Sequence, residues 1–392
     1  MNAAPSSSSV GAELSAGLVP LGAGMAEIAS DGRLTAIGAE PPARPLGRRP
    51  ARLARLFGTP LDAAISLGCL ALICLVGWPL LRWLVLDATF RGATREDCAP
   101  GGACWVFVRA RFAQFMYGFY PGPERWRVDL AGALLAGAVA ALAWPRLPGR
   151  RSLAAAALLI LPPLGLWLLY GGFGLRIVET REWGGLMLTV FLSVYGALIA
   201  IPLGVLLALG RQSRLPVLRL IATVFIKFWR GVPIIAVIFL ASLLLPLILP
   251  DGAAIDRLAR AVVGLGLCIA AYMAEAVRGG LQALPAGQAE AAAALGLGYW
   301  RTTGLVILPQ ALRIALPALT NEFIALVKNT SLVLIVSIFD LLGIAQAALA
   351  DPAWVGKTWE AYAFAGVIYW LACFGLSRWS LAVERRGART SR

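Results

Sequence analysis

Long apolar runs separated by short polar segments make up most of the chain between residues 61 and 381. A helix needs roughly 17–25 mainly apolar residues to cross a bilayer, and several runs reach that length. Apolar residues follow one another without strict alternation, which favours helices over membrane β-strands. The sequence therefore predicts an all-α membrane protein with about eight transmembrane helices. We place them at 61–86, 130–144, 153–173, 185–209, 233–249, 258–278, 314–341 and 363–381.

The fifth apolar region, 217–249, is too long for a simple crossing. Lys227, Arg230 and the segment Gly231-Val232-Pro233 interrupt it. We expect an amphipathic helix on the cytoplasmic side of the membrane, followed by a span that starts near Pro233.

Basic residues set the predicted orientation, because cytoplasmic turns carry an excess of Lys and Arg. Five arginines precede the first span, and each proposed inside turn has arginines near a helix end, whereas the last outside loop has only Lys357. Both termini are therefore predicted to be cytoplasmic. Residues 1–60 are rich in Ser, Gly, Ala and Pro, which predicts a disordered tail.

The loop 87–127 holds six arginines, which the charge rule disfavours outside, but long loops obey that rule less strictly. Helix alternation places the loop outside. Its aromatic residues are expected at the membrane interface, with a re-entrant or binding segment as the alternative. Cys98 and Cys104 lie in this loop, and the sequence leaves open whether they form a disulfide.

Composition narrows the possible chemistry. The chain of 392 residues is 59% hydrophobic and has a formal net charge of +14. Because the basic residues lie beside apolar runs, we interpret the charge as a topology signal and not as a nucleic-acid surface. There is no histidine, and no cysteine pair has zinc-binding spacing, so no metal site, cofactor or histidine-based catalysis is predicted.

One cytoplasmic segment is strongly helical yet poorly suited to lipid. Ala283 to Leu295 is rich in alanine, and Gly296 suits the left-handed position after a helix end. A second short helix is predicted from Tyr299 to Leu308, where Pro309 would stop it or begin the next helix. We call residues 283–309 the elbow. It is predicted to lie outside the membrane, where another protein could hold it.

Few charged residues lie within the predicted spans, so those few need an explanation. Asn321 and Lys328 share a helix face, and Asn329 and Thr330 follow. They are either interhelical bonding groups with a snorkelling lysine, or one wall of a substrate path.

Glu275 and Arg278 can pair at i, i+3 near the cytoplasmic end of the sixth span. We interpret them as a structural ion pair at the root of the elbow and not as substrate contacts.

The elbow resembles a known motif. Glu290-Ala291-Ala292, Gly296 and Leu308-Pro309 are similar to the EAA loop of ABC importer permeases, with Val306 where that family commonly has isoleucine. Five further segments resemble the polar amino acid permeases. They are 229–233 (WRGVP), 272–280 (YMAEAVRGG), 285–288 (PAGQ), 309–313 (PQALR) and 320–331 (TNEFIALVKNTS). The first three spans and the segment 102–107 (GACWVF) resemble the larger, M-type subunit of general L-amino acid importers.

The resemblance implies a five-helix permease core at 184–384, with the coupling loop at about 279–312 and a cytoplasmic tail at 385–392. Three accessory helices with a periplasmic loop occupy 61–183. It also implies an inner membrane protein that moves amino acids, with a broad range of L-amino acids as the expected substrates, by alternating access. A separate ATPase would dock on Glu290, Ala291, Ala292, Gly296, Leu308 and Pro309. A second permease subunit and a periplasmic binding protein would complete the system, and Asn321, Lys328, Asn329 and Thr330 would contact the substrate.

Two other classes remain as alternatives. An ion-coupled secondary transporter also has broken helices and midplane polar groups, but it should show inverted repeats and ion-binding carboxylates. A membrane-embedded enzyme is disfavoured, since neither a histidine nor an evident acid pair within one span is available. The sequence also lacks a phosphate-binding loop, so ATP hydrolysis would belong to a partner.

Overall fold

The computed structural model describes residues 56–144, 149–248 and 255–390. Residues 1–55 of the predicted tail, with the arginines that precede the first span, and the basic turn residue Arg146 lie outside the described residues. The chain divides into two compact units, Met1–Trp78 and Pro79–Arg392. Helix α2, Pro60–Leu81, crosses this boundary and has no buried residue.

The described part of the chain contains helices and isolated β-bridges but no strand. Seven of its helices are long and apolar enough to span a membrane, or up to eight if one bent pair is a single span. The prediction of about eight spans is confirmed. The seven run over Pro60–Leu86, Gly122–Ala143, Ser152–Tyr170, Gly185–Gln212, Arg257–Gln282, Tyr299–Val336 and Thr358–Arg385.

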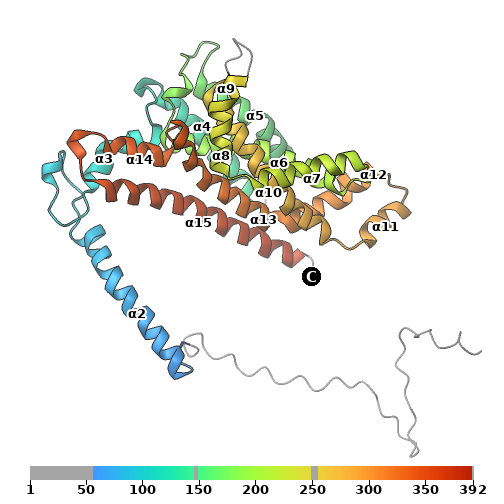
Figure 1. Cartoon of the computed structure of the whole chain (residues 1–392), viewed down its shortest axis with the longest axis horizontal. Helices are drawn as coiled ribbons and strands as arrows, with labels where there is room; N and C mark the ends of the chain where they lie inside the picture. Colours follow the sequence, from blue (N-terminus) through green and yellow to red (C-terminus); the bar gives the residue numbers. More distant parts are fainter. Residues whose placement is uncertain (1–55, 145–148, 249–254, 391–392) are drawn as a thin grey trace, which may run out of the picture. The chain divides into compact units, whose positions relative to one another are not determined.

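Three helices of the larger unit make up its centre: α6 (Gly185–Gln212), α10 (Arg257–Gln282) and α13 (Leu308–Asn329). Helix α10 packs against both others, and α15 (Thr358–Thr390) runs along α13 (Figure 1). Small residues allow this close approach. A β-carbon on Gly204 of α6 would lie 2.7 Å from the β-carbon of Met273 on α10.

The fifth apolar region is broken where its sequence predicts. Helix α7 (Pro216–Gly231) ends just before Pro233, and α8 (Ile234–Phe239) continues at an angle of 101°. Proline cannot donate the backbone hydrogen bond that would continue α7. The π-helical segment Leu240–Leu244 and α9 (Leu245–Ile248) follow.

The loop at 87–127 is folded, which corrects the expectation that all of its aromatic residues lie at the membrane interface. Cys98 and Cys104 are joined in a disulfide, and α3 (Trp105–Tyr117) begins directly after it. Phe107, Phe115 and Tyr120 are fully buried. Sequence reasoning missed this because the groups that cover two of these rings, Trp354 and Phe364, lie more than 200 residues away.

Two accessory helices precede the central three. Helices α4 (Arg125–Ala143) and α5 (Arg150–Tyr170) pack side by side, and the Tyr195 hydroxyl of α6 donates a hydrogen bond to the Pro162 carbonyl of α5. The remaining element of the C-terminal half is α14 (Leu341–Leu349). Short helical turns lie at Arg82–Leu86, Arg95–Asp97, Gly122–Glu124, Thr180–Glu182, Thr330–Val336 and Pro352–Trp354.

Candidate functional site: the elbow and the ion-pair cluster at its root

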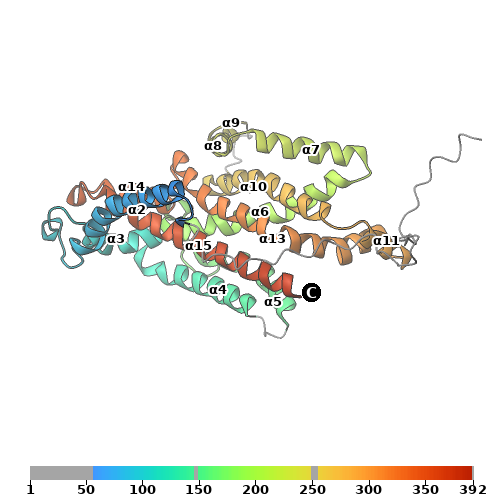
Figure 2. The ribbon, with the colours of Figure 1, turned by 90° about the horizontal axis from the view of Figure 1, so that it is seen from below.

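The elbow leaves the helical bundle at the end opposite α3 and α14 (Figure 2). Its first helix, α11, covers Gly287–Ala294 and is shorter than predicted, because residues 283–286 form a turn between the end of α10 at Gln282 and the start of α11. Its second arm consists of α12 (Tyr299–Arg301) and a π-helical segment (Thr302–Ile307). That arm continues into α13, with Pro309 in the first turn, so Pro309 starts a helix instead of stopping one.

Gly296 has the left-handed conformation that its position predicts, with φ of +74°. Its amide donates to the Ala293 carbonyl, and the Leu297 amide donates to the Ala292 carbonyl. This pair of bonds is the usual way in which a glycine closes the end of a helix. The turn therefore depends on the backbone conformation, since nothing lies within 4 Å of a β-carbon built at Gly296.

The outer surface of the elbow is apolar as well as exposed. Leu295 is 81% exposed, Trp300 79% and Leu305 71%, and Tyr299 is also exposed. Contiguous exposed apolar groups rimmed by polar residues are typical of an interaction surface. Of the predicted coupling residues, Glu290, Ala291, Gly296 and Pro309 are exposed and Leu308 is half-buried, whereas Ala292 is buried and helps hold α11 in place.

One polar contact links the two arms of the elbow. The Gln310 side-chain amide lies 3.2 Å from the side-chain oxygen of Gln288, at the start of α11. It also donates to the Val306 carbonyl within its own arm. Beside this contact is a cleft of about 610 Å³ lined by Gly304, Leu305, Val306, Pro309, Gln310 and Arg313.

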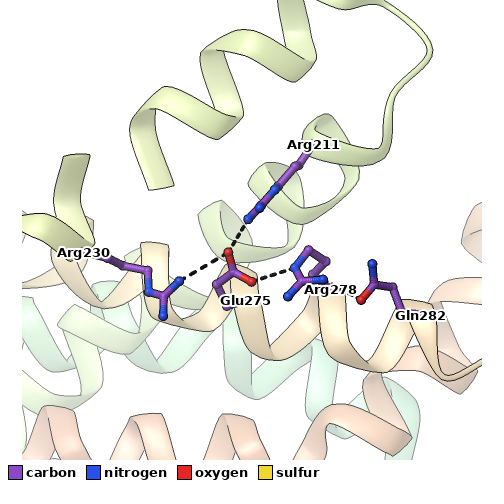
Figure 3. Close-up of polar contacts among 5 residues, drawn as sticks. All are labelled: Arg211, Arg230, Glu275, Arg278 and Gln282. Atoms are coloured by element: carbon purple, nitrogen blue, oxygen red, sulfur yellow. Dashed lines mark hydrogen bonds and ion pairs between the residues drawn. The ribbon is translucent and has the colours of Figure 1, made fainter. Parts of the chain in front are cut away.

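At the root of the elbow, one carboxylate meets three arginines (Figure 3). Glu275 of α10 pairs with Arg278 of the same helix, Nε to Oε2 at 2.6 Å. It also pairs with Arg211 at the end of α6 and, at 3.4 Å, with Arg230 near the end of α7. The Arg230 guanidinium in addition lies 5.5 Å from the centroid of the Tyr272 ring. We call these four charged residues the Glu275 cluster.

The Glu275 cluster joins three helices just before the chain enters the elbow. Arg278 further bonds to Gln282, the last residue of α10. Sequence reasoning found Glu275 and Arg278 because they are close in the chain. It missed Arg211 and Arg230, which lie on other helices far from Glu275 in the chain. The available signal was a single acid together with several arginines at helix ends.

The predicted substrate-path residues do not share one surface. Asn321 and Lys328 are exposed, and Asn329 is half-buried. Thr330 is fully buried, and its hydroxyl donates to the Val327 carbonyl and lies 3.3 Å from the Tyr369 hydroxyl. Thr330 follows the end of α13 in a tighter helical turn, which rotates it away from the preceding face.

A buried carboxylate near Thr330 was not anticipated. Asp340 is fully buried at the start of α14, where it accepts hydrogen bonds from the Gly343 amide and the Tyr369 hydroxyl. Thr189 of α6 accepts from the adjacent Leu341 amide. The network therefore connects α6, α14 and α15. Among the described residues, no group of three His, Cys, Asp or Glu side chains could hold a metal ion.

Comparisons with known proteins agree on one family. Residues 200–389 match the binding-protein-dependent transport system inner membrane component family. The chain is 51% identical to the inner membrane amino-acid ABC transporter permease protein YhdY of Escherichia coli strain K12 over 332 residues, which are 84% of this chain and 90% of that protein.

A second relative is the glutamate/glutamine/aspartate/asparagine transport system permease protein BztC of Rhodobacter capsulatus. It is 36% identical over 406 residues, with 86% of this chain and 93% of that protein covered. Among solved structures, a chain of an amino acid ABC transporter crystallised with histidines is 31% identical, with a TM-score of 0.46. That match covers 52% of this chain and 92% of the other.

Proposed function

The chain belongs to the amino-acid ABC transporter permeases, the inner membrane components of binding-protein-dependent transport systems, and we propose that its elbow is the surface on which a separate ATPase subunit docks. The permease itself is not an enzyme, and ATP is hydrolysed by the partner. The exposed apolar side chains of the elbow support this proposal most directly, because they lie on a short helical segment between two spans.

The chemistry of the elbow fits a protein partner. Ala291 and its neighbours in α11 have small side chains, so another backbone can approach the helix closely. Glu290 is exposed and can meet basic groups of the ATPase. Trp300 is an anchor of the type that contributes most to binding energy at protein interfaces.

The Glu275 cluster would carry movement of the elbow into the bundle. Because Glu275 pairs with arginines of α6, α7 and α10, these helix ends shift together when the elbow is displaced. Such a displacement, driven by closure of the ATPase pair, would rock the bundle between inward-open and outward-open states. The tight glycine contacts between α6, α10 and α13 favour movement as a rigid body.

The proposed assembly contains a second permease subunit, an ATPase and a periplasmic amino-acid-binding protein. With the elbow in the cytoplasm, alternation of the spans puts both termini in the cytoplasm and the disulfide-bonded loop outside, in an oxidising compartment. The substrate class that we propose is L-amino acids over a broad range. Asn321, Lys328 and Asn329 stay candidates for contact with the zwitterion, and Thr330 is a weaker one because it is buried.

The test is reconstitution in lipid vesicles. The full complex, loaded with ATP on the ATPase side, should accumulate labelled amino acids delivered by the binding protein. The purified chain alone should transport nothing in response to ATP or to a proton or sodium gradient. Transport by the chain alone under an ion gradient would favour a secondary transporter and contradict the proposal.

A further inference from the structure

An apolar cleft of about 460 Å³ lies between the two accessory helices and the central bundle. Its walls are formed by α4, α5 and α6, all of which qualify as membrane spans. On α4 the lining extends from Val128 to Leu142. At 1.5 Å per residue, that distance is about 20 Å, comparable to the roughly 15 Å depth of one leaflet of the hydrocarbon core.

The one charged side chain that lines this cleft, Asp129, lies at one end of it, whereas the Tyr195 hydroxyl farther along is bonded to the Pro162 carbonyl. The Tyr117 hydroxyl donates a hydrogen bond of 2.7 Å to the Asp129 carboxylate, and both side chains line the cleft. The Arg125 guanidinium lies 5.3 Å from the centroid of the Tyr117 ring. Among the described residues, neither Arg125 nor Asp129 forms an ion pair. Arg125 lies next to the cleft and not in its lining, and its Nε donates to the Tyr120 carbonyl. The remaining N–H groups of its guanidinium and the Asp129 carboxylate are the charged groups that this end offers to a ligand.

These polar groups lie at the level expected for lipid headgroups. Trp126 follows Arg125 in the chain and is 51% exposed, and aromatic side chains concentrate at the membrane interface. The cleft therefore has long apolar walls within the membrane, and one end, at the membrane surface, with a positive and a negative side chain. We call this end the mouth of the cleft.

We propose that this cleft binds one phospholipid whose headgroup carries an amine. One acyl chain lies along α4, α5 and α6, the phosphate faces Arg125, and the ammonium group faces Asp129. Burial of the acyl chain in the cleft gives little selectivity among lipids, because the surrounding bilayer is equally apolar. Selectivity comes from the two charges at the mouth, which match a zwitterionic headgroup better than one that carries only negative charge.

Two glycines of α4 provide a matched test. Gly132 lines the cleft and Gly137 does not, yet a β-carbon at either position meets nothing within 4 Å. The phenyl ring of Gly132→Phe should fill the cleft, whereas the ring of Gly137→Phe should lie outside it. The full chain is purified in mild detergent, and phospholipid that stays bound is quantified by mass spectrometry. We expect retained lipid from the wild type and from Gly137→Phe, and its loss from Gly132→Phe.

The headgroup preference is tested separately with Asp129→Asn, which keeps the side-chain size. In micelles that contain phosphatidylethanolamine and phosphatidylglycerol, the wild type should retain the former preferentially. In the variant, the ratio of retained phosphatidylethanolamine to phosphatidylglycerol should be about fivefold lower, which is the effect of one weak charge-assisted hydrogen bond. This comparison of two lipids on one protein does not depend on how well Gly132→Phe folds.

Three outcomes would overturn the proposal. The first is equal lipid retention by the two glycine variants, and the second is an unchanged headgroup preference in Asp129→Asn. The third is capture of a protein segment, such as a partner subunit or another helix of this chain, by a photoreactive residue at Leu134. Leu134 lines the cleft and is 37% exposed, so the proposal expects its cross-links to go to lipid.

Discussion

Two glycines that follow Glu275 along the chain show how the helical bundle differs from the elbow. At Gly280, on α10, a β-carbon would overlap the Ala311 carbonyl of α13 and lie 2.9 Å from the Ala315 β-carbon. At Gly296, in the elbow, a β-carbon would touch nothing, and glycine is favoured only by the positive φ. The bundle is thus specified by close packing, which favours rigid movement. The elbow is specified by backbone conformation, which leaves its surface free for a partner.

The largest effect on the free energy of unfolding is expected at Gly280, the tightly packed glycine. Gly280→Ala should destabilise the permease by about 1–3 kcal/mol, the usual cost of overpacking, because α10 and α13 must separate. Gly279→Ala is the matched control on the same helix, since its β-carbon meets nothing within 4 Å. In thermal unfolding of the purified chain, Gly279→Ala should have the same unfolding temperature as the wild type or a higher one. Equal stability of the two variants would show that the contact between these helices is not tight.

An intermediate effect is expected at the Glu275 cluster. Glu275→Gln would leave three arginines without their common carboxylate. We expect a loss of about 1–2 kcal/mol, reduced from the cost of breaking a buried pair because the arginine side chains are 28–44% exposed. Glu290→Gln, in an exposed position, should leave stability unchanged.

The same pair of variants separates stability from coupling. In the reconstituted complex, Glu275→Gln should lower transport per ATP hydrolysed, because α6 and α7 no longer follow the end of α10. If hydrolysis and transport fell together in proportion to the amount of folded complex, the cluster would have a structural role only.

An effect on stability of similar size, but confined to the elbow, is expected at Gly296. Gly296→Val forces a β-branched residue into a left-handed conformation, at a cost of about 1–2 kcal/mol. Gly298→Val is the control, because Gly298 has a φ of −68° and open space around it. Only Gly296→Val should weaken capture of the ATPase and reduce uptake, while membrane insertion stays normal. Gly296→Asn should be milder, since Asn adopts this conformation more readily.

The elements set by local sequence could be predicted, whereas those set by distant partners could not. The continuous apolar runs give the spans, and the glycine after an alanine-rich helix gives the turn at Gly296. The break before Pro233 was also evident, since proline leaves a helix one hydrogen bond short. These features depend on residues within a few positions of one another.

Three other features depend on contacts across the chain. Phe107 is buried against Trp354, Arg211 meets Glu275, and Asp340 bonds with Tyr369. A single sequence contains no record of which distant side chains meet. The aromatic residues of the loop at 87–127 therefore suggested an interfacial segment, although several of them form a buried cluster.

The most direct test of the central claim places a photoreactive amino acid at Trp300, which is 79% exposed on the elbow. Cross-linking is carried out in membranes that contain the assembled transporter. If the elbow is the docking surface, the ATPase subunit should be captured from Trp300 but not from Trp359, which is 74% exposed at the start of α15, away from the elbow. Capture of lipid alone from Trp300, or equal capture of the ATPase from both positions, would contradict the account.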